Sequence, residues 1–438
     1  MITAKAFAGK HYAVYGLARS GAATVEALLA SGARVTAWDA KEEARAKAPA
    51  GTEIANLDTA DLSQFDSLVV TPGLPLNRHP IAQRARDAGV EIIGDIELFA
   101  RARPELPPHK VVGITGTNGK STTTALIHHI LKTAGVPTTM GGNIGLPILA
   151  QDPLPEGGVY VLELSSYQID LTQSLDCEVA VLLNITPDHL DRYESLEAYA
   201  ASKIRLLEMQ REKNRIILGG QINLGQFEAI DAECKRRFEP PFTGSCYAYP
   251  AFVFRSLVPQ SELPNLQGPH NAENLAAAAY AVQSLALLTP DDIVEGLRTY
   301  PGLPHRMERV RERDDVLFLN DSKATNPTAT APALAAFQKI RWICGGQAKT
   351  DNLDECAPHF GHVRKAYTIG EAADLFERLL SPHIPVENCG KLDVAVREAA
   401  ADAEAGDTVL LSPACASFDQ FRDFEDRGDQ FRQLVGAL

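Results

Sequence analysis

The sequence contains the glycine-rich stretch Gly113-Ile114-Thr115-Gly116-Thr117-Asn118-Gly119-Lys120-Ser121. The apolar run Val111–Ile114 predicts a strand leading into it, and a helix is predicted from Lys120 to about Ala134, where Gly135 ends it. The backbone N–H groups of such a loop, together with the helix N-terminus, can cradle a triphosphate. The stretch therefore predicts a phosphate-binding loop in an α/β domain. A glycine-rich strand–helix turn without a ligand is the alternative.

Two side chains of this loop suit phosphate chemistry. Lys120 would reach phosphate oxygens, and Ser121 would help to hold Mg²⁺. The spacing departs from G-x-x-x-x-G-K-[ST], because Ile114 stands at the place of the first glycine. A Lys-Ser pair that follows glycine between a strand and a helix nevertheless favours phosphate binding. The predicted ATP-binding residues of the loop are Gly116, Thr117, Asn118, Gly119, Lys120, Ser121 and Thr122.

Polar residues follow the next two predicted strands of the same domain. Glu163 ends the apolar strand Val159–Leu162, and the segment from Asn184 to Arg192 follows the strand Val179–Leu183. Open α/β sheets place their chemistry at the carboxyl ends of their strands. Glu163 is therefore a candidate Mg²⁺ ligand. His189 is a candidate second ligand, although a single histidine is more often a structural hydrogen-bonding residue.

The N-terminus has the β-α-β pattern of a nucleotide-binding half. A strand to Tyr15 leads into Gly16-Leu17-Ala18-Arg19-Ser20-Gly21, a helix from about Ser20 to Ala30 follows, and the strand Val35–Trp38 ends at Asp39. This resembles the dinucleotide fingerprint with alanine at its second glycine. The alternatives are a nicotinamide or flavin site, a different nucleotide whose uracil or ribose meets Asp39, and a tight turn without a ligand.

Further breaks divide the chain into three α/β domains. The strand Ser67–Val70 and the turn Thr71-Pro72-Gly73 belong to the first domain, and the proline-rich segment 103–108 is predicted as a linker. Strands alternate with helical segments again beyond residue 303. We predict a Rossmann-like domain at 1–98, a central P-loop-type ATPase domain with a mostly parallel sheet at 99–302, and a Rossmann-like domain at 303–438.

Composition excludes several classes of protein. The 438 residues carry a net charge of −14 and no basic run, which argues against nucleic acid binding. No segment has the length and apolarity of a membrane span, and the N-terminus lacks the pattern of a signal peptide, so we expect a cytoplasmic protein without membrane contact. Seven cysteines, widely spaced and without a C-x-x-C pair, are expected to be reduced and mostly buried. Cys415, before a predicted helix, is interpreted as structural.

Nine motifs in a fixed order carry a family resemblance. They are GITGTNGKS, GGNIGLP, ELSSYQ, NITPDHLDRY, SKIRL, HNAEN, GLPHRME, NDSKATNP and LSPACASFDQF, from residue 113 to residue 421. Together they resemble the Mur ligase family over nearly the whole chain. NDSKATNP and LSPACASFDQF are most similar to the members that act on glutamate.

The resemblance implies an ATP-dependent amide ligase of peptidoglycan precursor synthesis. It would phosphorylate the carboxylate of UDP-N-acetylmuramoyl-L-alanine with ATP, and the amine of D-glutamate would attack the acyl phosphate. Two Mg²⁺ ions are implied as cofactors, and a monomer is expected. The first domain would bind the UDP-substrate, the central domain ATP, and the third domain glutamate.

Site residues follow from the same resemblance. The implied catalytic residues are Lys120, Lys203, His189 and Lys323. Further ATP contacts are implied for Asn271, Asn274, Arg306 and Asp321. The UDP-substrate would meet Gly16, Leu17, Ala18, Arg19, Ser20, Asp39, Thr71, Pro72, Gly73, Asn143, Ser165, Gln168 and His189. Glutamate would meet Lys323, Thr325, Lys349, Ser417 and Phe424. One Mg²⁺ would be held by Ser121 and Glu163, the other by His189 and a carbamylated Lys203.

Several of these residues have a plainer interpretation. Asn271 and Asn274 could cap a helix, Lys349 could be a solvated lysine, and Lys203, on a predicted helix from Leu196 to Gln210, could lie on a surface. Phe418 stands where the family leads us to expect a smaller aliphatic residue. Three competing functions remain: a related ligase or folylpolyglutamate synthase, a nicotinamide-dependent dehydrogenase, and a non-catalytic nucleotide-binding switch.

Overall fold

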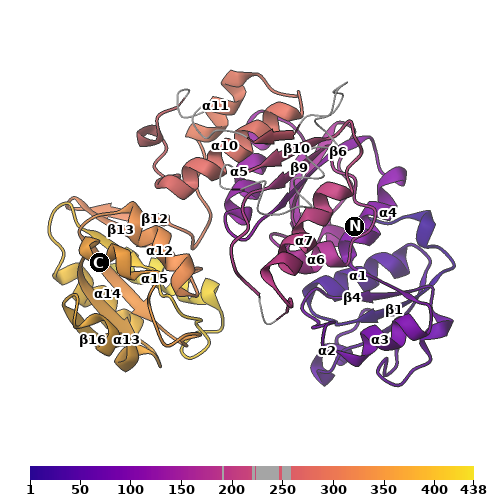
Figure 1. The fold of residues 1–438 in the computed structure, drawn as a ribbon, viewed down its shortest axis with the longest axis horizontal. Helices are drawn as coiled ribbons and strands as arrows, with labels where there is room; N and C mark the ends of the chain where they lie inside the picture. Colours follow the sequence, from indigo (N-terminus) through magenta and orange to yellow (C-terminus); the bar gives the residue numbers. More distant parts are fainter. Residues whose placement is uncertain (190–191, 220–221, 223–245, 249–257) are drawn as a thin grey trace. The chain divides into compact units, whose positions relative to one another are not determined.

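The computed structural model describes residues 1–189, 192–219, 222, 246–248 and 258–438, which contain three β-sheets (Figure 1). The chain divides into two compact units. One unit comprises Met1–Val258 and Glu273–Thr299, and the other comprises Pro259–Ala272 and Tyr300–Leu438. None of the helices in the described ranges is long and apolar enough to cross a membrane.

The first sheet has five parallel strands in the order β3-β2-β1-β4-β5. Its elements are β1 (His11–Tyr15), α1 (Arg19–Ala30), β2 (Arg34–Trp38), α2 (Glu42–Ala46), β3 (Glu53–Ile54), β4 (Ser67–Val70), α3 (Pro80–Asp87), β5 (Glu91–Ile93) and α4 (Asp95–Ala102). Tyr15 pairs with Trp38 on one side and Val70 on the other. The residues that follow these three strands therefore meet at one edge of the sheet.

The second sheet has six parallel strands in the order β11-β10-β9-β6-β8-β7. Its strands are β6 (His109–Thr115), β7 (Thr138–Gly142), β8 (Gly158–Glu163), β9 (Val179–Leu182), β10 (Arg215–Leu218) and β11 (Cys246–Ala248). Its helices are α5 (Lys120–Thr133), α6 (Ser166–Asp170), α7 (Leu196–Glu208), α10 (Pro269–Ser284) and α11 (Pro290–Arg298). Ile114 pairs with Glu163, and Thr115 with Leu182, so the glycine-rich loop and Glu163 lie at the same sheet edge.

The third sheet has the order β12-β13-β17-β14-β15-β16, and only its β12–β13 pair is antiparallel. Its strands are β12 (Glu308–Arg313), β13 (Val316–Asn320), β14 (Ile340–Gly345), β15 (Val363–Ile369), β16 (Val386–Gly390) and β17 (Thr408–Leu411). Its helices are α12 (Pro327–Ala336), α13 (Ala373–Leu380), α14 (Leu392–Ala401) and α15 (Phe424–Ala437). The predicted α/β class, with parallel sheets in the first two domains, is confirmed.

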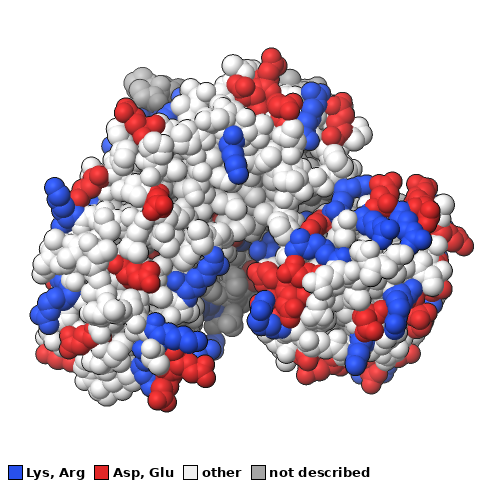
Figure 2. Space-filling view, turned by 180° about the vertical axis from the view of Figure 1, so that it is seen from behind, with Lys and Arg blue, Asp and Glu red and all other residues white. Residues whose placement is uncertain are grey.

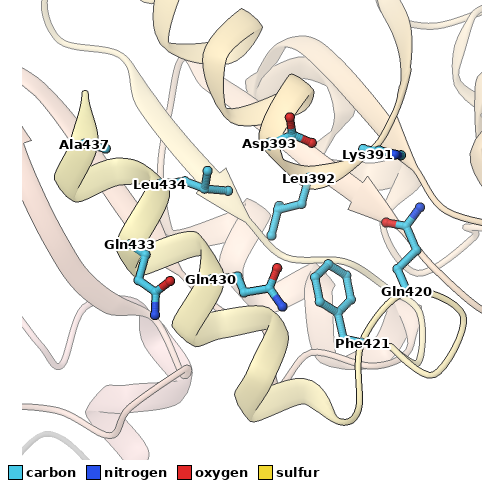
Figure 3. A pocket seen from close by; sticks show the side chains of 9 residues that line it. All are labelled: Lys391, Leu392, Asp393, Gln420, Phe421, Gln430, Gln433, Leu434 and Ala437. Atoms are coloured by element: carbon cyan, nitrogen blue, oxygen red, sulfur yellow. The ribbon is translucent and has the colours of Figure 1, made fainter.

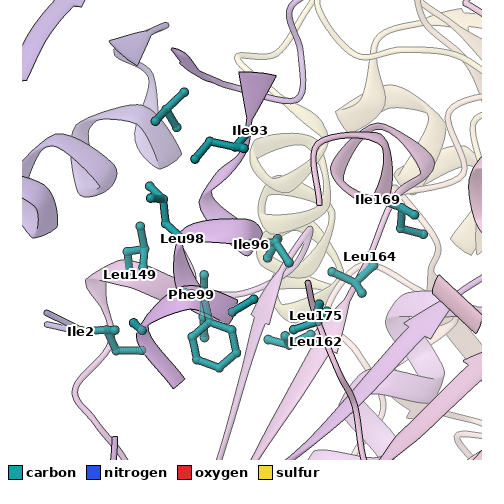
Figure 4. Close-up of a cluster of buried hydrophobic side chains, with 14 of the residues drawn as sticks. Ile2, Ile93, Ile96, Leu98, Phe99, Leu149, Leu162, Leu164, Ile169 and Leu175 are labelled. Atoms are coloured by element: carbon teal, nitrogen blue, oxygen red, sulfur yellow. The ribbon is translucent and has the colours of Figure 1, made fainter. Parts of the chain in front are cut away.

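The first two sheets share one hydrophobic core. Phe99 and Ile96 of α4 belong to the same buried cluster as Leu162 and Leu164 at the end of β8 (Figure 4). Burying such apolar side chains is the main favourable contribution to folding, at about 25 cal/mol for each Å² removed from water. This shared core joins the first sheet to the second within one compact unit.

The segment between these sheets differs from the predicted linker. Arg103–Glu105 forms a 3-10 helix with Pro104 in its first turn. Proline is tolerated there, because the N–H groups of a first turn donate no hydrogen bond within the helix. Arg103 donates hydrogen bonds to the carbonyl of Asp176 and to Glu178. A short 3-10 helix therefore occupies the first half of the predicted linker, and the consecutive prolines Pro107 and Pro108 lie outside every helix and strand.

Candidate active site

The glycine-rich loop has a backbone that only glycine adopts easily. Gly119, which precedes α5, has a φ of 84°, and Gly116 has a φ of 150°. A Cβ atom at Gly119 would overlap Oδ1 of Asn274. Lys120 folds back over the loop, and its Nζ donates to the carbonyls of Gly116 (3.0 Å) and Thr117 (2.7 Å). Lys120 therefore packs against its own loop, and Ser121 and Thr122 are buried in the first turn of α5.

Asn184 braces this loop, a role that was not predicted. Its Oδ1 accepts from the N–H of Asn118 at 2.9 Å, and its Nδ2 donates to the carbonyl of Asn118 at 3.1 Å. Its carbonyl accepts from the N–H of Thr117 at 3.0 Å. The position of Asn184 directly after an apolar strand was the available signal, since neighbouring parallel strands end at one sheet edge.

Glu163 has the environment of a metal ligand. Its side chain is buried, Oε1 accepts from Nδ2 of Asn143 at 2.8 Å, and Oε2 is buried without a hydrogen-bond partner among the described residues. A buried carboxylate oxygen without a partner is costly unless a ligand satisfies it. Mg²⁺ uses one or two protein oxygens together with water and substrate phosphates. The residues present therefore fit a Mg²⁺ ion, with Glu163 and Ser121 as candidate oxygen donors.

Lys203 lies inside the domain and not on its surface. It is 1% exposed on α7, and its Nζ donates to the carbonyl of Gly116 at 2.9 Å. Burial, reinforced by the charge of Lys120, lowers the pKa of Lys203 to about 6. The Nζ also lies 4.4 Å from the ring centroid of Tyr199. The structure therefore brings Lys203 beneath the phosphate loop as a largely neutral amine at pH 7.

His189 lies among aromatic rings. Its ring centroid is 5.0 Å from that of Tyr167 and 6.1 Å from that of Tyr199. Its φ of 55° is a left-handed conformation that is uncommon outside glycine and often marks functional sites. Its Nε2 is 3.5 Å from Oδ2 of Asp188. Because Tyr199 touches both Lys203 and His189, these two predicted ligands border the same side of the loop.

Asn271 and Asn274 lie within α10 and not at its N-cap. Asn274 contacts Thr123 of α5, with 3.4 Å between the side-chain oxygens. Asn271 donates to the carbonyl of Gln267 at 2.9 Å. The capping alternative is therefore excluded, and Asn274 belongs to the wall of the phosphate loop.

Two N-terminal turns meet at the edge of the first sheet. The N–H of Leu17 donates to Oδ2 of Asp39 at 2.7 Å, so Asp39 closes the turn after β1. A Cβ at Gly16, whose φ is 99°, would overlap Oγ1 of Thr71. Gly73, by contrast, has open space where a Cβ would project. The structure thus places Gly16, Leu17, Ala18 and Ser20 beside the turn from Thr71 to Gly73.

A loop of the second domain contacts the turn after β1. The Arg19 guanidinium donates to the carbonyl of Gly145 at 2.8 Å, in the loop that also carries Asn143. Ser165 and Gln168 form a reciprocal capping box at the start of α6. Their hydrogen bonds give both residues a structural role beside the predicted one.

In the other unit, Asp321 and Arg306 lie close together. Asp321 is buried, and Oδ2 accepts from Oγ of Ser412 at 2.8 Å. Burial raises the pKa of Asp321 to about 7, against the opposing effects of the Ser412 hydrogen bond and the Arg306 charge. Nε of Arg306 is buried without a hydrogen-bond partner among the described residues. A buried donor of this kind could be satisfied by an anionic ligand.

Four of the five predicted glutamate-binding residues form two pairs. Nζ of Lys349 donates to Oγ1 of Thr325 at 3.3 Å, and the lysine is exposed. Nζ of Lys323 lies 5.2 Å from the ring centroid of Phe424. Ser417 is buried in the loop after β17. Phe418 beside it is 69% exposed and has no part in this packing.

Arg427 joins the loops that carry these pairs, and it was not predicted. Its side chain is fully buried, and it donates to Oγ (2.9 Å) and the carbonyl (2.8 Å) of Ser322 and to the carbonyls of Cys415 (3.2 Å) and Ala416 (3.4 Å). It therefore fixes Ser322, next to Lys323, against the segment that leads to Ser417.

The described cysteines have the burial expected of structural residues. Cys177, Cys344, Cys356 and Cys415 are buried free thiols, and Cys389 is half-buried. Burial raises the pKa of Cys415 to about 12, which makes its thiolate scarce at neutral pH. Cys234 and the side chain of Cys246 lie outside the described residues.

A groove of about 490 Å³ lies between α14 and α15 (Figure 3). Leu392, Phe421 and Leu434 line it together with three glutamines, and none of the predicted site residues does. On the face drawn in Figure 2, acidic and basic side chains alternate and form no single-sign field. Within the described ranges, no cluster of three or more His, Cys, Asp and Glu side chains is arranged to hold a metal.

Comparisons with known proteins agree with this geometry. Residues 10–94 match the MurD-like N-terminal domain of Mur ligases, residues 114–236 the Mur ligase middle domain, and residues 305–415 the Mur ligase glutamate ligase domain. A protein of Novosphingobium aromaticivorans named UDP-N-acetylmuramoylalanine–D-glutamate ligase is 58% identical, over 100% of this chain and 97% of its own length. One of the same name from Sphingopyxis alaskensis is 56% identical, with 100% of both chains covered.

Solved structures share the fold at low sequence identity. MurF ligase from Thermotoga maritima in complex with ADP gives a TM-score of 0.57 at 15% identity, with 98% of this chain and 96% of that chain covered. UDP-N-acetylmuramate-alanine ligase MurC from the same organism gives 0.55 at 16% identity, with 98% and 99% covered. Because full-length relatives exceed half identity and the three domain matches follow one another along the sequence, this chain belongs to the Mur ligase family.

Proposed function

We propose that this protein is an ATP-dependent ligase that joins D-glutamate to UDP-N-acetylmuramoyl-L-alanine during peptidoglycan precursor synthesis. The observation that carries the proposal is the buried Lys203 amine, 2.9 Å from the carbonyl of Gly116 in a phosphate loop next to Glu163. The name and the 58% identity of the Novosphingobium relative support the substrate assignment. The enzyme would act in the cytoplasm as a monomer.

Each domain would bind one ligand. Residues 1–98 would hold the uridine nucleotide at the turns of Gly16 and Thr71, residues 99–302 would bind ATP, and residues 303–438 would receive glutamate. The alternative nicotinamide site at Gly16 is less well supported, because it leaves Lys120, Glu163 and Lys203 without a role. A folylpolyglutamate synthase, whose fold is shared, would have no need of the uridine turns.

The reaction has an electrostatic problem, because a carboxylate must approach a triphosphate. Its oxygen attacks the γ-phosphorus and ADP leaves, which forms an acyl phosphate. The glutamate amine then attacks the acyl carbon, loses a proton, and displaces phosphate as the amide forms. Lys120 and the loop N–H groups would stabilise charge on the transferring phosphoryl group. Bound Mg²⁺ would supply further charge neutralisation.

The two ion sites would use different protein groups. Ser121 and the unpartnered Oε2 of Glu163 would hold one Mg²⁺. His189 and Lys203 would hold the other, with Lys203 as a carbamate, because an ammonium would be repelled by the ion whereas carbamate oxygens suit a hard cation. The lowered pKa of Lys203 supports this assignment, since only a neutral amine reacts with CO₂. Asn143 would orient the reacting carboxylate beside Glu163.

Glutamate would be selected by charge and hydrogen bonding. Lys349 would pair with one carboxylate, while Thr325 and Ser417 would donate hydrogen bonds. Lys323, with its Nζ near the ring of Phe424, would meet both glutamate and the reacting phosphate. Arg306 and Asp321 would contact ATP from this unit, and Asn271 and Asn274 would meet the adenine.

Phosphate release tests this function. Purified protein would be incubated with ATP, Mg²⁺ and UDP-N-acetylmuramoyl-L-alanine, and each amino acid would be added in turn. We expect phosphate release and a new amide only with glutamate. Tight NAD binding without ATP hydrolysis would favour a dehydrogenase instead, and ATP binding without amide formation would favour a nucleotide-binding switch.

A further inference from the structure

Arg192 connects the first sheet to the second by contacts that no proposed role uses. One terminal nitrogen of its guanidinium, NH2, donates to the carbonyl of Pro72 at 3.3 Å and to the carbonyl of Leu74. In the opposite direction, Nδ2 of Asn77 donates to the carbonyl of Arg192 at 3.0 Å. The turn that begins at Thr71 is therefore tied to Arg192 at three points.

The same guanidinium also contacts the second sheet's helix α6. Its Cζ lies 4.2 Å from the ring centroid of Tyr167, a distance typical of a cation–π interaction. The Tyr167 ring lies in turn beside His189. The N–H of Arg192 donates to the carbonyl of His189 at 2.9 Å, which helps to hold the left-handed backbone there. One side chain thus contacts the uridine turn on one side and the surroundings of His189 on the other.

We propose that Arg192 is a positioning residue that sets the spacing between the uridine-binding turn at Pro72 and the metal-binding group at His189. The inference rests on the proposed function, which assigns the turn to the uridine end of the substrate and His189 to a Mg²⁺ ion at the reacting end. A planar guanidinium can donate in its plane while its face lies over an aromatic ring. A lysine ammonium lacks this geometry, and a methionine keeps only the stem.

The spacing matters because the substrate is held at one end and reacts at the other. Remote binding energy accelerates a reaction only if the reacting group is delivered to the correct place, and a displacement of about 1 Å can cost about 100-fold. Loss of Arg192 should therefore affect the UDP-substrate and leave the affinity for ATP largely unchanged. A general loss of folding would affect both.

Steady-state kinetics with the full-length enzyme tests the proposal. Arg192→Met should lower kcat/KM for the UDP-substrate by about 100-fold and leave the ATP KM within about twofold of wild type. Arg192→Lys should lose about tenfold, and this variant decides the matter if the methionine variant does not fold. Arg86→Met is the matched control, because Arg86 bonds only to Gln83 on its own helix among the described residues, and it should leave both constants unchanged.

A double-mutant cycle adds a readout that a merely structural role would not produce. If Arg192 acts through Tyr167, then Arg192→Met combined with Tyr167→Leu should be no worse than the more damaging single variant. Additive losses, a change in kcat/KM below about threefold, or an equal rise in the ATP KM would overturn the proposal.

Gly73→Ala separates this inference from the proposed function. Apart from its neighbours in the chain, no atom of the described residues lies within 4 Å of a methyl group at Gly73, so the methyl should obstruct only a ligand that lies against the turn. If Gly73→Ala lowers kcat/KM for the UDP-substrate and Arg192→Met changes it by less than about threefold, only the role of Arg192 fails. If neither variant changes kcat/KM for that substrate, the uridine assignment of the turn fails as well. Gly361→Ala, whose added methyl also meets open space, controls for the substitution itself.

Discussion

Replacement of Lys203 gives the strongest test of the proposed second metal site. Its amine is 1% exposed, donates to Gly116 and lies near the charge of Lys120. An ammonium in this position would be both desolvated and repelled. We therefore expect Lys203→Ala to be nearly inactive, because the variant lacks the amine that would become a carbamate.

The fraction of Lys203 that is neutral, and so can react with CO₂, follows from its pKa, which burial lowers from 10.5 to about 6. At pH 7.5 a lysine with the higher value is about 0.1% neutral, whereas one with the lower value is about 97% neutral, a gain of about 1000-fold in reactive amine. Because the folded-state pKa is the lower one, protonation sets in only as the pH falls through about 6. Carbamate formation and activity should both decline over that range.

Carbon-13 NMR with labelled bicarbonate measures the carbamate directly. Wild type and Lys132→Met, which removes an exposed lysine, should show the same carbamate resonance, and Lys203→Met should lack it. Acetate should restore part of the activity of Lys203→Ala by supplying carboxylate oxygens. Full activity in Lys203→Ala, or a resonance independent of Lys203, would refute the reasoning. Failure of acetate alone would not, because a free ion loses more entropy on binding than a tethered group.

Three further predictions concern single lysines. Lys120→Ala should abolish phosphate release without lowering the melting temperature by more than a few degrees, since the hydrogen bonds that it donates to Gly116 and Thr117 are local to the loop; wild-type turnover would remove the loop from the mechanism. Lys349→Ala should raise the glutamate KM by about tenfold or more and the ATP KM by less than about twofold, whereas equal rises would indicate a general lesion. Lys203→Met should be more stable to urea than wild type at pH 7.5 in CO₂-free buffer, by at most about 4 kcal/mol, because the unfolded wild-type chain binds a proton that the folded chain does not. This gain should shrink as the pH rises toward 10.5 and is absent if burial does not depress the pKa.

Residues at the ends of parallel strands could be predicted from the sequence. The loop at Gly116, the carboxylate of Glu163 and the turn at Gly16 each follow an apolar run directly, and parallel pairing then places such ends at one sheet edge. The assignment of Lys349 and Thr325 to one glutamate site was a different kind of prediction. It came from family resemblance, because nothing in the local sequence around Lys349 indicates its partner.

Residues that act through distant contacts could not be predicted in this way. Arg192 meets Pro72 and Leu74, which lie 120 and 118 positions earlier in the chain. Arg427 meets Ser322 across 105 positions. Neither arginine stands at a strand end or in a glycine-rich turn, and helical periodicity gives no information on which loop a side chain will reach. Their roles depend on tertiary packing, which overrides local pattern.

Contacts between the first two domains should hold the proposed uridine-binding turns at a constant distance from the phosphate loop. Glu97 is buried, and its carboxylate accepts from the N–H groups of Gln173 (2.7 Å) and Ser174 (2.9 Å) and from Oγ of Ser174 (2.8 Å). Such charge-assisted bonds, beside a shared apolar core, resist sliding of one sheet past the other. The proposed uridine-binding turns and the phosphate loop therefore belong to one compact unit, whereas Lys349 and Thr325 belong to the other. Two solved Mur ligases, MurC and MurF from Thermotoga maritima, share this fold over nearly their whole length at 15 to 16% identity. Since a fold alone selects no amino acid, selection must come from side chains, and Lys349 and Thr325 of the second unit are the ones that we propose.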